Sequence, residues 1–299
     1  MLRNQDTRNL AQTQATDLAN HMTGKTYFYA DDEPELYDRA VSLTDRSYEM
    51  GHDALQYCVD SWVQAQGCGK LSAANVLDLG CGTGKEALRL LDTIPSCHLV
   101  TVDNSALMLS SFRRKTLIDF GEQVLADRVS VELSDFTEPK WFERASLLSR
   151  APFDIVVAAH SLHHLPGDTK MRLYGEVATL LRPGGLFAIL DLFDFAQPWL
   201  SDLGKSNISD WLRSQMSPES PAANHAGLFP LARRMQLSEM WLDHLKRENI
   251  PLPISVHANL PPPAVAHTET ILLASNGFHK IEVPFRWFQS GLIVATKSH

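Results

Sequence analysis

The feature that most constrains the fold is an alternation of short apolar runs with longer amphipathic segments, which starts at residue 76. Short apolar runs are typical of buried strands, and amphipathic segments of helical spacing are typical of helices that cover a sheet. Five such runs stand at 76–80, 98–103, 129–133, 153–159 and 186–192. The pattern predicts an α/β fold with a mainly parallel sheet and helices on both faces.

The chain closes with two further apolar runs, at 279–288 and 291–297, that are only a few residues apart. So short a connection cannot hold a crossover helix, so these two strands must pair antiparallel. Pro284 cannot donate a backbone hydrogen bond, which predicts an edge position or a bulge for the first of them. The sheet is therefore expected to contain seven strands.

Between residues 193 and 268 the rhythm breaks, and helix-like pieces lead into the proline-rich stretch IPLPISVHANLPPPA. This composition predicts an inserted helical lid. The expected organisation is a flexible N-terminus at 1–26, N-terminal helices at 27–70, a core at 71–192, the lid at 193–268, and a C-terminal helix with a strand pair at 269–299.

Composition excludes several classes of protein. The formal net charge of −8 repels phosphate backbones, so we expect no nucleic-acid partner. Four cysteines without a CxxC pair indicate neither a disulfide scaffold nor a zinc ribbon. No segment approaches the roughly 18 to 20 apolar residues that span a bilayer, which predicts a cytoplasmic protein without membrane contact. The acid-poor start around Arg3 and Arg8 leaves an organellar transit peptide as an alternative.

The sequence LGCGTG at 79–84 joins the first strand to a helix. Glycines at these positions let the backbone turn tightly and approach a ligand, which indicates a nucleotide-like cofactor. Lys85 occupies a position that a dinucleotide fingerprint reserves for a small residue, so NAD is disfavoured. The spacing suits a cofactor without a pyrophosphate. The turn residues expected to bind it are Gly80, Cys81, Gly82 and Gly84.

Five further residues, at or after the ends of the second and third strands, are candidates for cofactor binding. Asp103 ends the second strand, where a carboxylate in this architecture accepts hydrogen bonds from ribose hydroxyls. Asn104 follows it, and Met108 offers an apolar wall to adenine, with a place in the core as the alternative. After the third strand, Asp135 is placed to accept from an adenine amino group and the Phe136 amide to donate to a ring nitrogen. A plain polar strand end is the other interpretation of that pair.

The sequence AHSLHHL at 159–165 follows the fourth strand, at the edge where open α/β sheets bind ligands. We expect His160 to shape the pocket for the amino acid part of the cofactor. The carbonyl of Ala159 is expected to accept from an ammonium group. His163 and His164 are neighbours that point in different directions, with no carboxylate at ligand spacing, so no metal site is predicted.

Four ordered motifs together resemble the class I S-adenosylmethionine-dependent methyltransferases: VLDLGCGTG at 76–84, VTVDNSALML at 100–109, FDIVVAAHSLHHL at 153–165 and LLRPGGLFAIL at 180–190. The resemblance implies a Rossmann-like sheet of seven strands whose last strand is antiparallel. It also implies S-adenosyl-L-methionine as cofactor, S-adenosyl-L-homocysteine as product, and a small-molecule acceptor methylated at an O, N or C nucleophile.

The segment YDRAVSLTDRSYEM at 37–50 is similar to a helix that closes over the cofactor in small-molecule methyltransferases and in carboxy-S-adenosylmethionine synthase. The resemblance implies that Arg46 and Tyr48 reach the cofactor's carboxylate. The tail at 274–297 is also similar to that synthase. A synthase needs a basic residue in the insert, however, and the arginines there lie in surroundings that do not match it, which favours plain methyl transfer.

Methyl transfer is an in-line displacement in which alignment supplies most of the acceleration. A general base is needed only for an acceptor that must lose a proton, and His160 and Asp191 are the candidates. The alternative interpretation of Asp191 is that it caps a helix or supports another residue of the site. Three other functions stay open: a carboxy-S-adenosylmethionine synthase of tRNA modification, a non-catalytic cofactor-binding regulator, and, last, an NAD oxidoreductase. A homodimer also stays open.

Overall fold

The computed structural model describes part of the chain. The described residues are Pro34, Tyr37, Asp38, Val41 and the ranges 47–67, 74–163, 165–215 and 264–298. The predicted flexible segment 1–26, Arg46 and much of the predicted lid, 216–263, lie outside them. Among the helices described, none combines the length and apolar character needed to span a bilayer.

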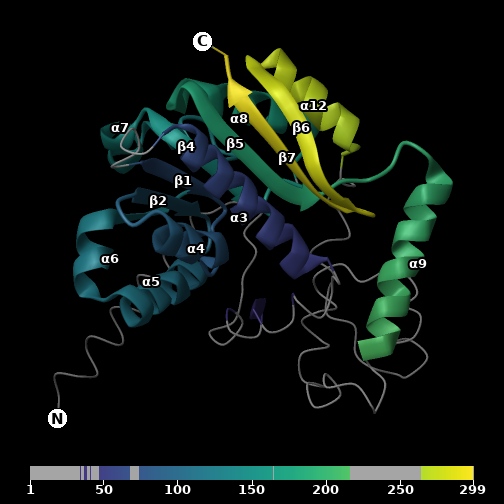
Figure 1. Cartoon of the computed structure of the whole chain (residues 1–299), viewed down its shortest axis with the longest axis horizontal. Coiled ribbons are helices and arrows are strands. Elements are labelled where there is room, and N and C mark those ends of the chain that lie inside the picture. The colour runs from purple at the N-terminus through teal and green to yellow at the C-terminus, as the bar shows by residue number, and fades with distance from the viewer. Residues whose placement is uncertain are drawn as a thin grey trace.

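Seven strands form one sheet in the order β3-β2-β1-β4-β5-β7-β6 (Figure 1). Strands β1 to β5 pair in parallel, and β7 pairs antiparallel with both β5 and β6. The predicted Rossmann-like sheet is confirmed, and β6, which carries Pro284, lies at its edge as expected. The strands are β1 Asn75–Leu79, β2 His98–Asp103, β3 Val129–Leu133, β4 Phe153–Ala159, β5 Leu181–Leu192, β6 Phe278–Trp287 and β7 Ser290–Lys297.

One strand begins earlier than the sequence predicts. Strand β5 starts at Leu181 rather than at residue 186, because Leu181 already pairs with Phe153 before the register shifts. The turn-forming residues 183–185 therefore lie inside the strand as an irregular stretch, with Gly184 at φ +73°.

Helices cover both faces of the sheet, as the sequence predicts, because each face carries its own apolar core. The helices on one face are α3 Tyr48–Ala65, α4 Lys85–Thr93 and α5 Ala106–Phe120. Those on the other face are α7 Ala145–Arg150, α8 Gly167–Leu180 and α12 Ala266–Ser275. The remaining helices are α6 Glu122–Arg128, the short 3₁₀ helix Trp141–Glu143 and α9 Pro198–Gln215.

The carboxyl ends of the parallel strands meet at one edge of the sheet. Residues 80–84, 103–105 and 160–163 all follow strands at this edge. Strand β7 runs the opposite way, so its first residue, Ser290, lies there too. Figure 1 shows α9, drawn in light green, beyond this end of the sheet. Open α/β sheets bind ligands at this edge, which makes it the place to look for a site.

Candidate functional site

The turn between β1 and α4 holds three glycines in the left-handed region of backbone space. Their φ angles are +72° at Gly80, +54° at Gly82 and +89° at Gly84. Residues with a side chain rarely adopt this backbone conformation, so the turn requires glycine. The turn is fixed to β2 because the backbone N–H of Gly80 donates to the carbonyl of Val102 at 2.7 Å.

The three glycines differ in what surrounds them. A Cβ at Gly84 would lie 2.1 Å from the Phe112 ring, and one at Gly80 would lie 2.4 Å from Cβ of Ser161. A Cβ at Gly82 would meet no atom of the described residues within 4 Å. The outer two glycines therefore serve packing, whereas Gly82 leaves open space above the backbone, as a close-lying ligand needs.

Asp103 lies beneath this turn. Its Oδ2 accepts a hydrogen bond from the backbone N–H of Gly82 at 2.8 Å, and its Oδ1 accepts from Ser105 N–H at 2.8 Å. The side chain is 9% exposed. Burial raises the pKa of this carboxyl, and the backbone hydrogen bonds oppose that rise. The structure thus brings together the two features that the sequence predicts as a cofactor-binding pair.

The predicted adenine-side residues lie around the same turn. The backbone N–H of Ser134 donates to the Asp103 carbonyl at 3.0 Å, which places the end of β3 beside the end of β2. The Phe136 ring lies 3.5 Å from where a Cβ of Gly80 would be, and Asp135 accepts from the Thr137 N–H at 2.8 Å. Met108 is buried, and Asn104 contributes a backbone hydrogen bond to Asp103.

His160 comes directly after Ala159, the last residue of β4, and has a positive φ of +53°. Its backbone N–H donates to the carbonyl of Leu190 at 2.7 Å. Its ring stacks on Tyr48 with centroids 5.2 Å apart and an interplanar angle of 25°. The structure therefore joins two residues that the sequence assigned separately to the amino acid end of the cofactor.

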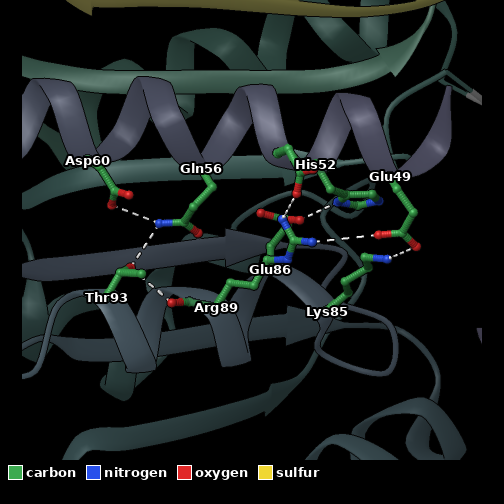
Figure 2. A network of polar contacts seen from close by, with 9 residues as sticks. Glu49, His52, Gln56, Asp60, Lys85, Glu86, Arg89 and Thr93 are labelled. Carbon is green, nitrogen blue, oxygen red and sulfur yellow. Dashed lines mark hydrogen bonds and ion pairs between the residues drawn. The ribbon is translucent and has the colours of Figure 1, made fainter.

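Helix α3 is tied to the turn and to α4 by polar contacts that sequence reasoning missed (Figure 2). His52 Nδ1 and Glu86 Oε1 form a hydrogen bond in which both side chains are 2% exposed. Lys85 turns away from the turn to pair with Glu49 at 2.6 Å, and its Nζ lies 4.4 Å from the Tyr48 ring centre. The helical spacing of polar residues in α3 could have indicated such contacts from the sequence, but it does not identify the residues that they contact.

The N-terminal part of the chain reaches the turn through Asp38. Thr83 Oγ1 donates to one carboxylate oxygen of Asp38, and Lys115 Nζ pairs with the other. Thr83 is itself part of the glycine turn, so the segment that resembles a cofactor-closing helix does contact this turn. Arg46, predicted for the cofactor's carboxylate, lies outside the described residues.

Asp191 is fully buried near the end of β5, and its partner is His163 rather than His160. Its Oδ1 lies 2.5 Å from His163 Nδ1, and its Oδ2 accepts from the Leu162 N–H at 2.8 Å. The sequence predicts His160 and Asp191 as bases but does not connect Asp191 with His163. In the part of the chain that the structure describes, no three His, Cys, Asp or Glu side chains are grouped as a metal site.

Residues 76–185 match a family model described as a methyltransferase domain. The match identifies this region as similar to a methyltransferase domain, as the motifs in the sequence predict. The matched range includes the glycine turn, Asp103 and the stretch from His160 to His163. The S-adenosylmethionine cofactor that the sequence predicts agrees with this description.

Two curated relatives are similar to parts of this chain. The chain is 32% identical over 126 residues to demethylmenaquinone methyltransferase from Leptospira interrogans, a match that covers 42% of this chain and 46% of the relative. It is 27% identical over 228 residues to carboxy-S-adenosyl-L-methionine synthase from Yersinia pestis, covering 75% and 70%. The chain thus spans about half the length of the first of these relatives.

Among solved structures, a possible exported protein from Bordetella parapertussis has the same fold. Its TM-score is 0.51 at 16% sequence identity, and the match covers 83% of this chain and 67% of that one. At this identity the likeness supports the sheet and its helices, and it carries no information about the substrate.

Proposed function

We propose that the protein transfers a methyl group from S-adenosylmethionine to a small-molecule acceptor with an O, N or C nucleophile. The observation that carries the proposal is the hydrogen bond between Gly82 and Asp103 beneath the open space above Gly82. When bound there, the cofactor supplies an electrophilic methyl group. The residues of the chain supply binding and alignment, which are the main sources of acceleration in such a displacement.

The cofactor residues are assigned by their places around the turn. Asp103 keeps further lone pairs on both carboxylate oxygens, which fits the hydroxyls of a ribose. Asp135 and Phe136 are assigned to adenine. The carbonyl of Ala159, the ring of His160, and Tyr48 with Arg46 are assigned to the amino acid end. The stacking of Tyr48 on His160 supports placing those two together.

The acceptor is proposed to lie beyond the ends of β4 and β5, beside the start of the predicted lid. The name of the Leptospira relative, a demethylmenaquinone methyltransferase, supports a small organic acceptor rather than a macromolecule. The net charge of −8 also disfavours a nucleic acid. A cytoplasmic location is supported by the three described cysteines, Cys58, Cys81 and Cys97, all of which are free thiols. Self-association stays a prediction.

Calorimetry with S-adenosylmethionine and with its product tests the cofactor assignment. Both are expected to bind at one site, and ATP and NAD are expected not to compete. Transfer of radiolabelled methyl groups to a panel that includes reduced demethylmenaquinone then tests the reaction. Failure to bind S-adenosylmethionine contradicts the proposal outright. Binding without any turnover, together with a copurifying partner protein, favours a non-catalytic regulator instead.

A second candidate is synthesis of carboxy-S-adenosylmethionine, favoured by the longer match to the Yersinia relative, which spans 70% of that protein. Such an enzyme would retain a cofactor that carries an extra carboxylate. Mass spectrometry of the nucleoside released from freshly purified protein distinguishes the two candidates. Plain S-adenosylmethionine or its product in that fraction supports methyl transfer.

A further inference from the structure

A histidine and an aspartate form a close pair at the ligand-binding edge. His163 Nδ1 lies 2.5 Å from Asp191 Oδ1, and the two side chains are 9% and 2% exposed. His163 lies in the stretch that follows β4, and Asp191 lies near the carboxyl end of β5. The pair therefore bridges the two strands beyond which the acceptor is expected.

Asp191 is fixed as the orienting member of this pair. Its Oδ2 accepts from the Leu162 N–H, and its Oδ1 also accepts from its neighbour Leu192 N–H at 2.8 Å. Burial opposes ionisation of this carboxyl, but its interaction with His163 holds its pKa well below the usual range. A buried carboxylate so engaged cannot itself receive a proton from an acceptor, so it acts through His163.

The hydrogen bond to Asp191 also determines which ring nitrogen of His163 is basic. An ionised carboxylate only accepts hydrogen bonds, so Nδ1 must carry the hydrogen. In a neutral imidazole the lone pair then resides on Nε2. The arrangement of an oriented imidazole with a carboxylate behind it is the one that general-base catalysis uses.

The stretch that carries His163 is anchored to the cofactor turn. Ser161 Oγ donates to the carbonyl of Leu79 at 2.7 Å, and Ser161 Cβ lies 2.4 Å from where a Cβ of Gly80 would be. Any side chain at Gly80 would therefore push this stretch away. Because His163 is only two residues beyond Ser161, the cofactor turn and the histidine are held in one rigid unit.

We propose that His163 is the catalytic base of the methyl transfer and that Asp191 is its positioning residue. The inference rests on the proposed function and narrows its acceptor class to molecules whose reacting hydroxyl must lose a proton. In the step, the acceptor oxygen forms a bond to the methyl carbon. The carbon–sulfur bond breaks, its electron pair stays on sulfur, and the acceptor's proton passes to Nε2 of His163.

The charged groups around the pair come from three elements. His160 lies at the end of β4, and Lys170 and Tyr174 lie on α8. Glu269 on α12 pairs with Lys170 and accepts from the Tyr174 hydroxyl at 2.6 Å. Lys170 and Glu269 pair with each other. Asp191 therefore supplies the negative charge beside a protonated His163.

Nuclear magnetic resonance tests the pair without an acceptor. In protein labelled with nitrogen-15 histidine, the His163 signals, assigned with His163→Gln, are expected to show a hydrogen on Nδ1 and none on Nε2 at neutral pH. Asp191→Asn is expected to mix the two tautomers, whereas the exposed control Asp168→Asn leaves them unchanged. A hydrogen on Nε2 in the wild-type protein overturns the inference.

Two acceptors of one shape test the chemistry. A phenol such as 2-naphthol holds its proton up to a pH of about 10, whereas a thiol ionises from about 8.5 or below. His163→Asn is expected to slow transfer to 2-naphthol by about 100-fold or more. At a pH where 2-naphthalenethiol is ionised, the same substitution is expected to change the rate of transfer to this thiol only a few-fold. Equal losses for the two acceptors, or no loss, overturn the inference.

The remaining measurements separate this inference from the proposed function. Calorimetry on His163→Asn is expected to give wild-type affinity for S-adenosylmethionine, and His267→Asn, exposed on α12, is the matched control. In Asp191→Asn, kcat with 2-naphthol is expected to fall while affinity for S-adenosylmethionine stays at the wild-type value, because the imidazole loses the carboxylate that orients it. If the wild type binds no cofactor, the proposed function fails; if only the His163 effects are missing, the inference fails alone.

Discussion

Gly82 and Asp103 are joined by a hydrogen bond of 2.8 Å from the backbone N–H of the glycine to Oδ2 of the carboxylate. The contact joins the cofactor turn to the end of β2 and leaves the carboxylate in place for a ligand. Replacing Asp103 by Asn keeps the shape of the side chain but removes the ionised acceptor. Because hydrogen bonds to charged groups contribute about 1.5–3 kcal/mol, affinity for S-adenosylmethionine should fall roughly 10- to 100-fold.

Calorimetry measures that loss, and Asp119→Asn, exposed on α5, is the control for a general effect of removing one negative charge. The free energy of unfolding of both variants should be checked in urea, because Asp103 also accepts from Ser105. Unchanged affinity in folded Asp103→Asn protein would contradict the placement of the nucleoside over this turn.

The glycines of the turn should separate a binding effect from a folding effect. Gly277 has a φ of +82°, and a Cβ there would meet no atom of the described residues within 4 Å, so Gly277→Ala measures the cost of a left-handed backbone alone, about 1–2 kcal/mol. Gly84→Ala should destabilise more than this, because the new Cβ overlaps the Phe112 ring. Gly82→Ala should match Gly277→Ala in stability yet lower cofactor affinity at least 10-fold. Urea unfolding and calorimetry on all three variants provide the comparison.

The parts of the fold that follow from local sequence could be predicted. Strands β1 and β2 are buried on both faces, so they appear in the sequence as continuous apolar runs. The position of Asp103 relative to the turn follows from topology, because neighbouring parallel strands end at the same edge. Even the edge position of β6 follows from one residue, Pro284, that cannot donate a backbone hydrogen bond.

The pairings that depend on how helices settle on the sheet could not be predicted. His52 and Glu86 are 34 positions apart, and Lys170 and Glu269 are 99 apart. Periodicity shows that such residues lie on a helix, but a polar residue on the buried face gives no sign of its partner. The same limit applies to Asp191: the sequence offers His160 and Asp191 as separate candidate bases, and only the structure shows that Asp191 pairs with His163.

The His52–Glu86 pair should give the protein a level region in its pH–stability profile. Burial raises the pKa of Glu86 to about 7 and lowers that of His52 to about 3, so the folded pair holds one proton between these values. In the unfolded chain the two groups have their ordinary pKa values of 4.5 and 6.5. They hold two protons below pH 4.5, one between pH 4.5 and 6.5, and none above pH 6.5. Stability from this pair is therefore lost as pH falls below about 4.5, and again as pH rises from about 6.5 to 7.

The measurement is the free energy of unfolding of the wild type minus that of His52→Gln/Glu86→Gln, which cancels the other titrating groups. This difference should be level between pH 4.5 and 6.5, the ordinary values of the two groups, and lower on either side. A difference that rises or falls steadily across the whole range would show that the two groups do not share a proton.

Lys170 and Glu269 make a buried ion pair between α8 and α12, with side chains 2% and 0% exposed. Lys170→Met should cost about 3–5 kcal/mol of unfolding free energy, because it leaves the Glu269 charge buried without a partner. Lys170→Met/Glu269→Gln should recover most of this, since Gln removes the charge and still accepts from the Tyr174 hydroxyl. Urea unfolding of the wild type and both variants measures the two values. A double variant as unstable as the single one would show that packing between the helices, rather than the unpaired charge, accounts for the loss.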